Sequence, residues 1–416
     1  MENKHLETEA ALVRKILGYG SNTPLDSNHS VLVEDWEHSW KSSEGDQQAY
    51  NFSYILNPTG TIRWFFPSDT QYPAYLSLYN SAHLKARVYK LCTHAAFSLN
   101  LQKKLFSGSF SIKTSKLPFQ DLLKTLDAET YAVFTGTVGE NRKSVAAIYR
   151  NKSVSHFVKL SHSDKAKEIL SNEEKMLKYL SDLPFFRLDH PRVHPDSKEG
   201  CLILSNIKPT PAREVARLED MHIEVLSEIY KFTAKEEIMA SSTFYREIHE
   251  NLSRICTREV LDPAINNPVL NRIIDNLIKL TKSLSPAKFF QTSLAHGDFT
   301  PWNMYLSDNY VHLYDWELSR KGLPLFFDLY HYMYQSGVLL LRQNYDQILR
   351  EISRSFRLPH SKRLCKQYGL DLQYYHKLYL LYIISYYLRI YMDEESVHMQ
   401  VHWLMDIWDQ ALQHTH

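Results

Sequence analysis

Cysteine is scarce in this sequence, and no pattern among the cysteines suggests a disulfide framework or a metal site. The four residues, Cys92, Cys201, Cys256 and Cys365, are scattered through the chain without a CxxC pair or the spacing of metal ligands. Isolated cysteines of this kind are typical of reduced thiols in a cytosolic protein. We therefore expect reduced, mostly buried thiols and a cytoplasmic location.

The sequence also lacks a large excess of charge of either sign. Its formal net charge at pH 7 is +1, from 48 Lys and Arg against 47 Asp and Glu. Proteins that bind nucleic acid or anionic membranes mainly by charge carry a strong basic surplus. The composition therefore argues against a nucleic-acid partner.

Long uncharged apolar runs are absent as well. The N-terminal sequence MENKHLETEAALVRKIL has acidic residues where a secretory signal has a basic stretch followed by an apolar one. The most apolar segment is Leu372–Met392, and its longest run without charge or histidine is Leu378–Leu388. A helix that spans a bilayer needs ~20 apolar residues. We expect a buried helix in this segment, no membrane insertion and no secretory signal.

Length and composition predict more than one domain. With 416 residues, of which 44% are apolar, the chain exceeds an ordinary single domain and can bury several cores. Changes in pattern divide it into an accessory α/β unit (1–125), a small β-rich lobe (126–208) and a mainly helical lobe (209–416). The predicted fold class is α+β.

The accessory unit carries no chemical motif that we can name. Two apolar runs flank Asn57-Pro58-Thr59-Gly60, which predicts a β-hairpin because Pro and Gly supply the turn angles. Between residues 74 and 105, apolar residues such as Val88 and Leu91 recur at helical spacing. We interpret residues 1–125 as a scaffold or docking module, through which a protein partner or a dimer could bind.

The next segment predicts three strands followed by a helix. YAVFTGTVGENRKSVAAIYR predicts two strands joined by a turn, with Gly136 and Gly139 near its tip. SHFVKLS predicts a third strand that carries Lys159 between apolar neighbours, and a helix follows from about Lys165. Alone, GTVG resembles any hairpin turn and a lysine is usually solvated. The order of these elements resembles that of the small lobe of a kinase, and this order carries the hypothesis of an ATP site.

The helix after Lys159 offers two adjacent glutamates as partners for it. Met176, Leu177 and Leu180 follow Glu173 at +3, +4 and +7, which places them near the same helix face. We therefore predict that Glu173 faces the sheet and pairs with Lys159, whereas Glu174 is solvated.

A further apolar strand, CLILSNI, ends in a position that fits a hinge between two lobes. Backbone groups around Ser205–Ile207 could then hydrogen-bond an adenine edge. The alternative is a plain buried strand that leads into a Pro-containing exit. The hinge assignment depends on the order of elements alone.

The stretch with the densest chemistry is HGDFTPWN, followed by an apolar strand and then DWE. Asp298 can accept a proton from a hydroxyl group, and Asn303 and Asp315 offer oxygen atoms of the kind that Mg²⁺ prefers. Phosphoryl transfer needs mainly such ligands, one proton acceptor and correct positioning. His296 and Pro301 are expected to fix the loop. Each residue alone would be an ordinary cap or turn residue, and their combination indicates an active site.

HGDFTPWN and YDWELSRKGLPLFFDLYHYM together resemble the catalytic and metal loops of the aminoglycoside phosphotransferase and choline kinase superfamily. The resemblance runs from about residue 131 to the C-terminus and implies a two-lobed protein-kinase-like fold, preceded here by the accessory unit. By this resemblance Asp298 is the catalytic base, Asn303 and Asp315 are Mg²⁺ ligands, and Lys159, paired with Glu173, binds the phosphates of ATP.

Two further acidic residues match the same superfamily. Glu317 corresponds to a position on the substrate side, and Asp328 to one that braces the core helix. The glycine turn is shorter than the superfamily pattern, which leaves phosphate contacts from that turn in doubt. The accessory unit is not a standard part of such kinases.

The acceptor of the phosphoryl group is less well indicated. Many tyrosines follow Asp328, and an acidic triplet begins at Asp393, which suits a cationic alcohol through cation–π and charge contacts. Aromatic residues at helical spacing are more often core, so amino alcohol, aminoglycoside and sugar stay open. Two other functions are also considered, a catalytically silent kinase-like scaffold and a protein kinase. The intact set of Lys159, Asp298, Asn303 and Asp315 favours an ATP- and Mg²⁺-dependent kinase of a small-molecule hydroxyl.

Overall fold

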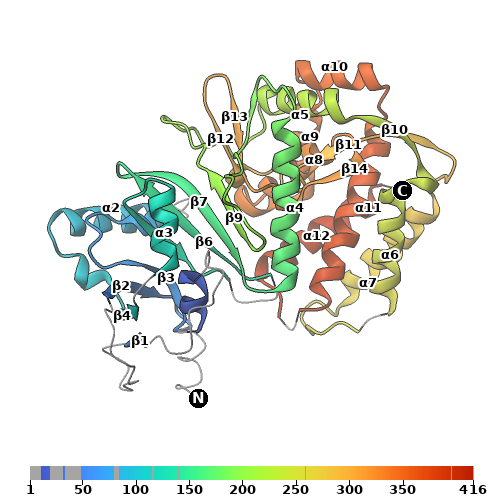
Figure 1. The fold of residues 1–416 in the computed structure, drawn as a ribbon. Coiled ribbons are helices and arrows are strands. Elements are labelled where there is room, and N and C mark those ends of the chain that lie inside the picture. The colour runs from blue at the N-terminus through green and yellow to red at the C-terminus, as the bar shows by residue number, and fades with distance from the viewer. Residues whose placement is uncertain are drawn as a thin grey trace. The chain divides into compact units, whose positions relative to one another are not determined.

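A computed structural model of the chain divides into two compact units by its internal contacts. The first unit comprises residues 1–178 and 191–206, and the second comprises residues 179–190 and 207–416. Figure 1 shows the ribbon coloured along the chain. The structure describes residues 11–18, 31–32, 48–78, 84–114, 117–137, 141–257, 259–394 and 396–415.

The first unit is organised around one antiparallel sheet, eight-stranded over the described residues. In spatial order its strands are β1 (Val31–Leu32), β4 (Gly108–Thr114), β2 (Gln48–Leu56), β3 (Ile62–Pro67), β5 (Thr130–Phe134), β6 (Lys143–Arg150), β7 (Ser153–Ser161) and β9 (Cys201–Ser205). The predicted hairpin around Asn57–Gly60 is confirmed as β2–β3, and the predicted run of strands from residue 130 to residue 161 is confirmed as β5–β7.

Strands from the predicted accessory unit and from the predicted small lobe share this sheet. β3 pairs with β5, so that Trp64 lies opposite Phe134 and Phe65 opposite Val133. The sheet is therefore continuous across residues 125 and 126. That these segments are separate folding units stays a prediction.

Side chains alternate between the two faces of the sheet, and each face has its own core. Phe65, Tyr131 and Ile148 pack on one face, beneath α3 (Pro118–Thr125) and the helical residues 11–17. Their neighbours in sequence, including Trp64 and Ala132, pack on the other face with η1 (Ala74–Leu78) and Phe97 of α2 (Leu84–Ser98). Both cores contain residues from before and after residue 125.

The helical spacing noted between residues 74 and 105 corresponds to a helix, α2. The described residues of this segment form η1, α2 and η2 (Gln102–Leu105). Val88 and Leu91, which helical spacing assigned to a buried face, are 51% and 70% exposed. A regular apolar spacing identified the helix but not which side of it packs.

The predicted helix near Lys165 is α4 (Asp164–Ser181), which follows β7 directly. β6 and β7 are joined by a tight turn at Asn151 and Lys152, both with positive φ. Such a turn matches the twist of paired strands.

The second unit is mainly helical and contains two small sheets. The sheets are β10 (Lys235–Ile238) with β11 (Phe289–Ala295) and β14 (Arg320–Pro324), and β12 (Met304–Leu306) with β13 (Val311–Leu313) and β8 (Leu188–Asp189). The helices are α5 (Asp220–Thr233), α6 (Thr243–Thr257), α7 (Pro268–Lys282), α8 (Phe327–Gln335), α9 (Tyr345–Ser355), α10 (Pro359–Tyr368), α11 (Leu372–Tyr391) and α12 (Met399–Gln413). A β-rich unit with a helical unit confirms the α+β class.

The predicted buried helix is α11, whose central residues from Leu378 to Ser385 are all buried. Among the described residues, no helix combines the length and the apolarity that crossing a membrane requires. The cysteines are free, but the expectation that most are buried is wrong. Only Cys201 is buried, whereas Cys92 and Cys256 are exposed.

Candidate active site

The stretch HGD follows β11 and is held in place by Asp328, the second residue of α8. The backbone N–H groups of His296 and Gly297 donate to Oδ2 and Oδ1 of Asp328 at 2.7 and 3.0 Å. Burial raises the pKa of Asp328 above its usual value, and the charge of His296 and the two N–H donors partly offset this effect. Asp328 therefore fixes the start of the loop.

His296 joins this loop to the next one. Because a carbonyl oxygen can only accept, His296 Nε2 donates to the backbone oxygen of Tyr314 at 2.7 Å, and Nδ1 accepts from the N–H of Asp298 at 3.2 Å. The ring is fully buried against Trp316, with centroids 4.7 Å apart. The ring thus links the residues before Asp298 to those before Asp315.

Both carboxylate oxygens of Asp298 are oriented by hydrogen bonds. Asn303 Nδ2 donates to Oδ2 at 2.8 Å and to the backbone oxygen of Asp298 at 3.0 Å. His331 Nε2 lies 3.3 Å from Oδ1, which accepts. Burial acts to raise the pKa of Asp298, but the hydrogen bond and charge of His331, with the charge of His296, outweigh it and leave the pKa lower than usual. The side chain keeps 25% exposure, so an ionised, oriented carboxylate is available to a substrate.

His331 is a site residue that the sequence analysis missed. It lies on α8, is fully buried, and stacks on Phe327 at 6.1 Å and 9°. Its Nδ1 has no hydrogen-bond partner among the described residues. Its spacing from Asp328 could have indicated it, because a residue three positions after Asp328 lies near the same face of the helix.

Asn303 and Asp315 have donor atoms that fit Mg²⁺. Because the carboxylate of Asp298 only accepts, the amide nitrogen of Asn303 faces it and the amide oxygen faces away. Asp315 adopts a left-handed conformation, with φ 61° and ψ 60°, immediately before η5 (Trp316–Leu318). The N–H of Tyr314 donates to the backbone oxygen of Asn303 at 2.8 Å, which couples the two loops. Glu317, the predicted substrate-side residue, is half-buried within η5.

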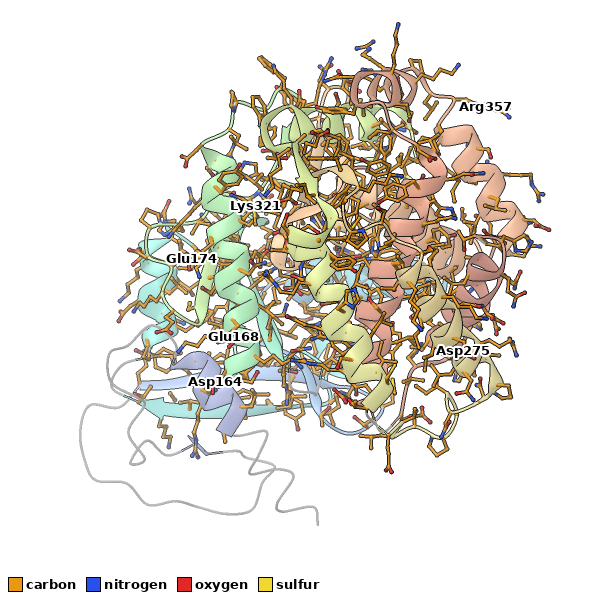
Figure 2. All side chains as sticks on the ribbon, turned by 90° about the vertical axis from the view of Figure 1, so that its right-hand side faces the viewer. Asp164, Glu168, Glu174, Asp275, Lys321 and Arg357 are labelled. Carbon is orange, nitrogen blue, oxygen red and sulfur yellow. The ribbon has the colours of Figure 1, made fainter. Side chains whose placement is uncertain are left out.

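In the first unit the structure brings Lys159 and Glu173 together, as expected. Lys159 Nζ donates to both carboxylate oxygens of Glu173 at 2.8 and 2.7 Å, and the side chains are 14% and 0% exposed. Glu174, labelled on α4 in Figure 2, instead pairs with Lys178 at 2.7 Å, and its side chain is 26% exposed. The choice between the two adjacent glutamates was therefore correct for the ion pair.

The two glycines of the β5–β6 turn differ in what the structure describes. Gly136 has φ +82°, and an added Cβ would lie 2.0 Å from the backbone oxygen of Lys143, so the turn requires glycine here. Gly139 lies outside the described residues. Contact of either glycine with phosphates stays a prediction.

The predicted hinge donors are already engaged. The N–H of Ser205 donates to the backbone oxygen of Arg192 at 3.0 Å, and that of Ile207 donates to the hydroxyl of Tyr314 at 3.0 Å. An adenine edge at Ser205–Ile207 would have to use carbonyl groups or displace one of these bonds. Contact between adenine and the backbone of Ser205–Ile207 therefore stays a prediction.

A cavity of about 450 Å³ in the second unit opens beside Asp298. Trp302 of the HGDFTPWN loop and Tyr387 and Tyr391 of α11 are among its lining residues. Most of the other tyrosines that suggested a cation pocket belong to the core, where they are fully or largely buried: Tyr330, Tyr332, Tyr334, Tyr375, Tyr379 and Tyr382. For most of these tyrosines, the interpretation as core residues is therefore the correct one.

Comparison with known proteins gives remote matches only. No protein-family model and no curated protein matches the sequence. Similar solved structures include a thermostable mutant of the aminoglycoside phosphotransferase APH(4)-Ia in its apo form (12% identity, TM-score 0.45, 71% of this chain and 98% of that chain). A second is a putative fructosamine-3-kinase from Haemophilus somnus 129PT (12% identity, TM-score 0.43, 70% of this chain and 95% of that chain). A third is amicoumacin kinase hAmiN (14% identity, TM-score 0.42, 70% of this chain and 93% of that chain). All three names are those of kinases or phosphotransferases.

Proposed function

We propose that the protein is an ATP- and Mg²⁺-dependent phosphotransferase that moves the γ-phosphoryl group to a hydroxyl of a small molecule. The observation that carries this proposal is the Asp298 carboxylate. It is held at both oxygens by Asn303 and His331, is partly exposed, and lines a cavity large enough for a small ligand. A purely structural aspartate would not need an oriented carboxylate at the wall of a cavity.

The role of Asp298 follows from its ionisation and geometry. The acceptor hydroxyl gives its proton to Asp298 as its oxygen forms a bond to the γ-phosphorus. The bond between that phosphorus and the bridging oxygen breaks, and ADP leaves with the electron pair. Most of the rate enhancement in such reactions comes from positioning and charge neutralisation, so the fixed orientation of Asp298 is its main contribution.

Other residues of the chain supply the remaining requirements. Asn303 and Asp315 would hold Mg²⁺, which neutralises phosphate charge when bound. Lys159, kept extended by its ion pair with the buried Glu173, would place a positive charge on the phosphates of ATP. Glu317 is assigned to the substrate side, and a protein partner or dimer through residues 1–125 stays a prediction.

A small acceptor is favoured over a protein side chain. Between Asp315 and Asp328 the chain forms η5 and then β14, which pairs with β11. This short connection leaves no extended segment on which a peptide could dock.

ATP binding tests the proposal without knowledge of the acceptor. Calorimetric titration with ATP and Mg²⁺ is expected to detect binding by the wild type, and Lys159→Met is expected to weaken it at least tenfold. Lys152→Met, in the exposed turn before β7, is the matched control and should bind normally. The proposal is wrong if the wild type binds no nucleotide, or if Lys159→Met binds it as well as the wild type does.

A further inference from the structure

The cavity beside Asp298 contains polar groups for which the protein provides no partner. Gln335, the last residue of α8, is only 5% exposed and lines the cavity, and its carboxamide makes no hydrogen bond to any described residue. Tyr387 lines the same cavity, and its hydroxyl likewise has no such bond. Neither side chain is among the described ones whose unpaired polar atoms are sealed from solvent, so these groups reach the cavity, where a ligand can hydrogen-bond them.

Gln335 lies on α8 one turn after His331, the residue that contacts Asp298. The two side chains therefore lie near the same face of α8. The chain then continues as the π-helix η6 (Ser336–Leu340), in which the N–H of Leu341 donates to the backbone oxygen of Ser336 at 3.0 Å. Single π turns of this kind are rare and often accompany functional sites.

The charge of the lining disfavours an anionic acceptor. Among the described lining residues, Asp298 and Glu394 are acidic, His398 is the one histidine, and none is Lys or Arg. Glu394 is exposed at the end of α11, where solvent screens it. The deeper polar groups, Gln335 and Tyr387, are neutral, so a fixed cation would find only the carboxylate of Asp298 inside the cavity.

The aromatic rings do not form a cage for a cation. Tyr387 stacks on Tyr391 at 5.6 Å and 14°, and on Trp408 at 6.2 Å and 17°. Ring faces that stack on one another in this way are used in packing, whereas cation–π binding needs a ring face turned to the ligand. Trp302 is 41% exposed and contributes a large apolar surface at the cavity.

We propose that this cavity takes an uncharged, polyhydroxylated acceptor, such as a sugar or another polyol. Gln335 and Tyr387 hydrogen-bond its hydroxyl groups, and Trp302 covers its apolar side. One acceptor hydroxyl then faces Asp298, loses its proton to that carboxylate and takes the γ-phosphoryl group of ATP, with ADP as the leaving group. This assignment rests on the proposed function and adds to it the class of acceptor.

Matched sets of sugars test the charge preference. Each set contains a neutral hexose, its 2-amino-2-deoxy analogue and its 6-phosphate, in the gluco, galacto and manno series. Binding to the full-length protein is followed by ligand-observed NMR, and ADP formation by a coupled assay with ATP and Mg²⁺. A neutral sugar is expected to bind and to be phosphorylated at least tenfold more efficiently than its charged counterparts.

Two variants test the residues. Gln335→Leu and Tyr387→Phe are each expected to raise the KM for the neutral sugar about tenfold, because each removes a hydrogen bond to the acceptor. Gln373→Leu and Tyr386→Phe, on α11 outside the cavity lining, are the matched controls and should leave the KM unchanged. Gln335→Leu should also unfold at the same temperature as the wild type, since the carboxamide makes no hydrogen bond to a described residue; a structural role would instead lower the temperature.

The outcomes separate this inference from the proposed function. Transfer to an amino sugar or a sugar phosphate in preference to the neutral sugar would refute the inference while supporting the kinase. Absence of binding by every neutral sugar, or an unchanged KM in both cavity variants, would also refute it. Binding of neutral sugars without ATP binding would refute the kinase and leave the binding site standing.

Discussion

Replacing Gly297 by alanine should disturb the position of Asp298 in the active site. Gly297 has φ +86°, and a Cβ added there would lie 2.3 Å from the backbone oxygen of Leu318. Real Cβ atoms essentially never approach closer than 3.0 Å, so the backbone must move by about 0.7 Å. The residue that moves with it is Asp298.

The chain provides a matched control for the backbone angle. Gly60, at the tip of the β2–β3 hairpin, has φ +84°, but an added Cβ there meets nothing within 4 Å. Both alanine variants should lose about 1–2 kcal/mol of unfolding free energy from the left-handed conformation. Gly297→Ala should lose roughly 1–3 kcal/mol more from overpacking, and its turnover should fall ~10- to 100-fold, because displacements near 1 Å have effects of that order.

Chemical denaturation and steady-state turnover with ATP and Mg²⁺ measure the two effects. Gly60→Ala should keep the turnover of the wild type, whereas Gly297→Ala should not. If the two variants lose equal stability and Gly297→Ala keeps full turnover, the positional constraint on Asp298 inferred here is wrong.

Three further predictions concern other parts of the chain. His331→Phe should lower kcat about tenfold with little change in the KM for ATP, because it removes a hydrogen bond to the Asp298 carboxylate, and His331→Gln should restore part of it. The His222 ring caps α5 by accepting a hydrogen bond from the N–H of Glu219 at 2.9 Å, and burial lowers the pKa of His222 to about 4. As the pH falls, His222 is protonated in the unfolded chain before it is protonated in the folded one, so the free energy of unfolding should fall by about 3 kcal/mol between pH 6.5 and pH 4. His222→Gln should remove this pH dependence while keeping the cap. Deleting residues 1–125 should leave β5 without its β3 partner and expose the apolar residues that pack there, so the fragment should aggregate.

Each of these has a clear contrary result. Full kcat in His331→Phe would show that the imidazole does not orient Asp298. Urea unfolding curves of His222→Gln that keep the wild-type pH dependence would show that another group titrates. A soluble 126–416 fragment with one cooperative unfolding transition would show that residues 1–125 form a separable unit.

The parts of the site that local sequence determines could be predicted from it. HGDFTPWN fixes a loop whose internal hydrogen bonds join residues a few positions apart, as in the bond between Asn303 and Asp298. The pairing of Lys159 with Glu173 was predicted from the spacing of apolar residues along the helix, which shows the face that packs on the sheet. Both depend on short-range geometry that a sequence pattern contains.

Features that depend on contacts distant in sequence could not be predicted in this way. His331 reaches Asp298 only because Asp328 fixes α8 beneath the loop. The engagement of the Ile207 N–H by Tyr314 joins residues more than a hundred positions apart. Likewise, the pairing of β3 with β5 and the exposure of Leu91 are set by tertiary packing, which overrides local periodicity.

The most direct test of the central claim is phosphoryl transfer by Asp298→Asn. This change keeps the size of the side chain and removes the proton acceptor, and Asp308→Asn, an exposed residue before β13, is its control. ³¹P NMR of wild-type protein with ATP, Mg²⁺ and an accepted polyol should show ADP and a phosphomonoester. Asp298→Asn should bind ATP with unchanged affinity and lose at least a hundredfold in turnover. Wild-type turnover in Asp298→Asn would contradict the account.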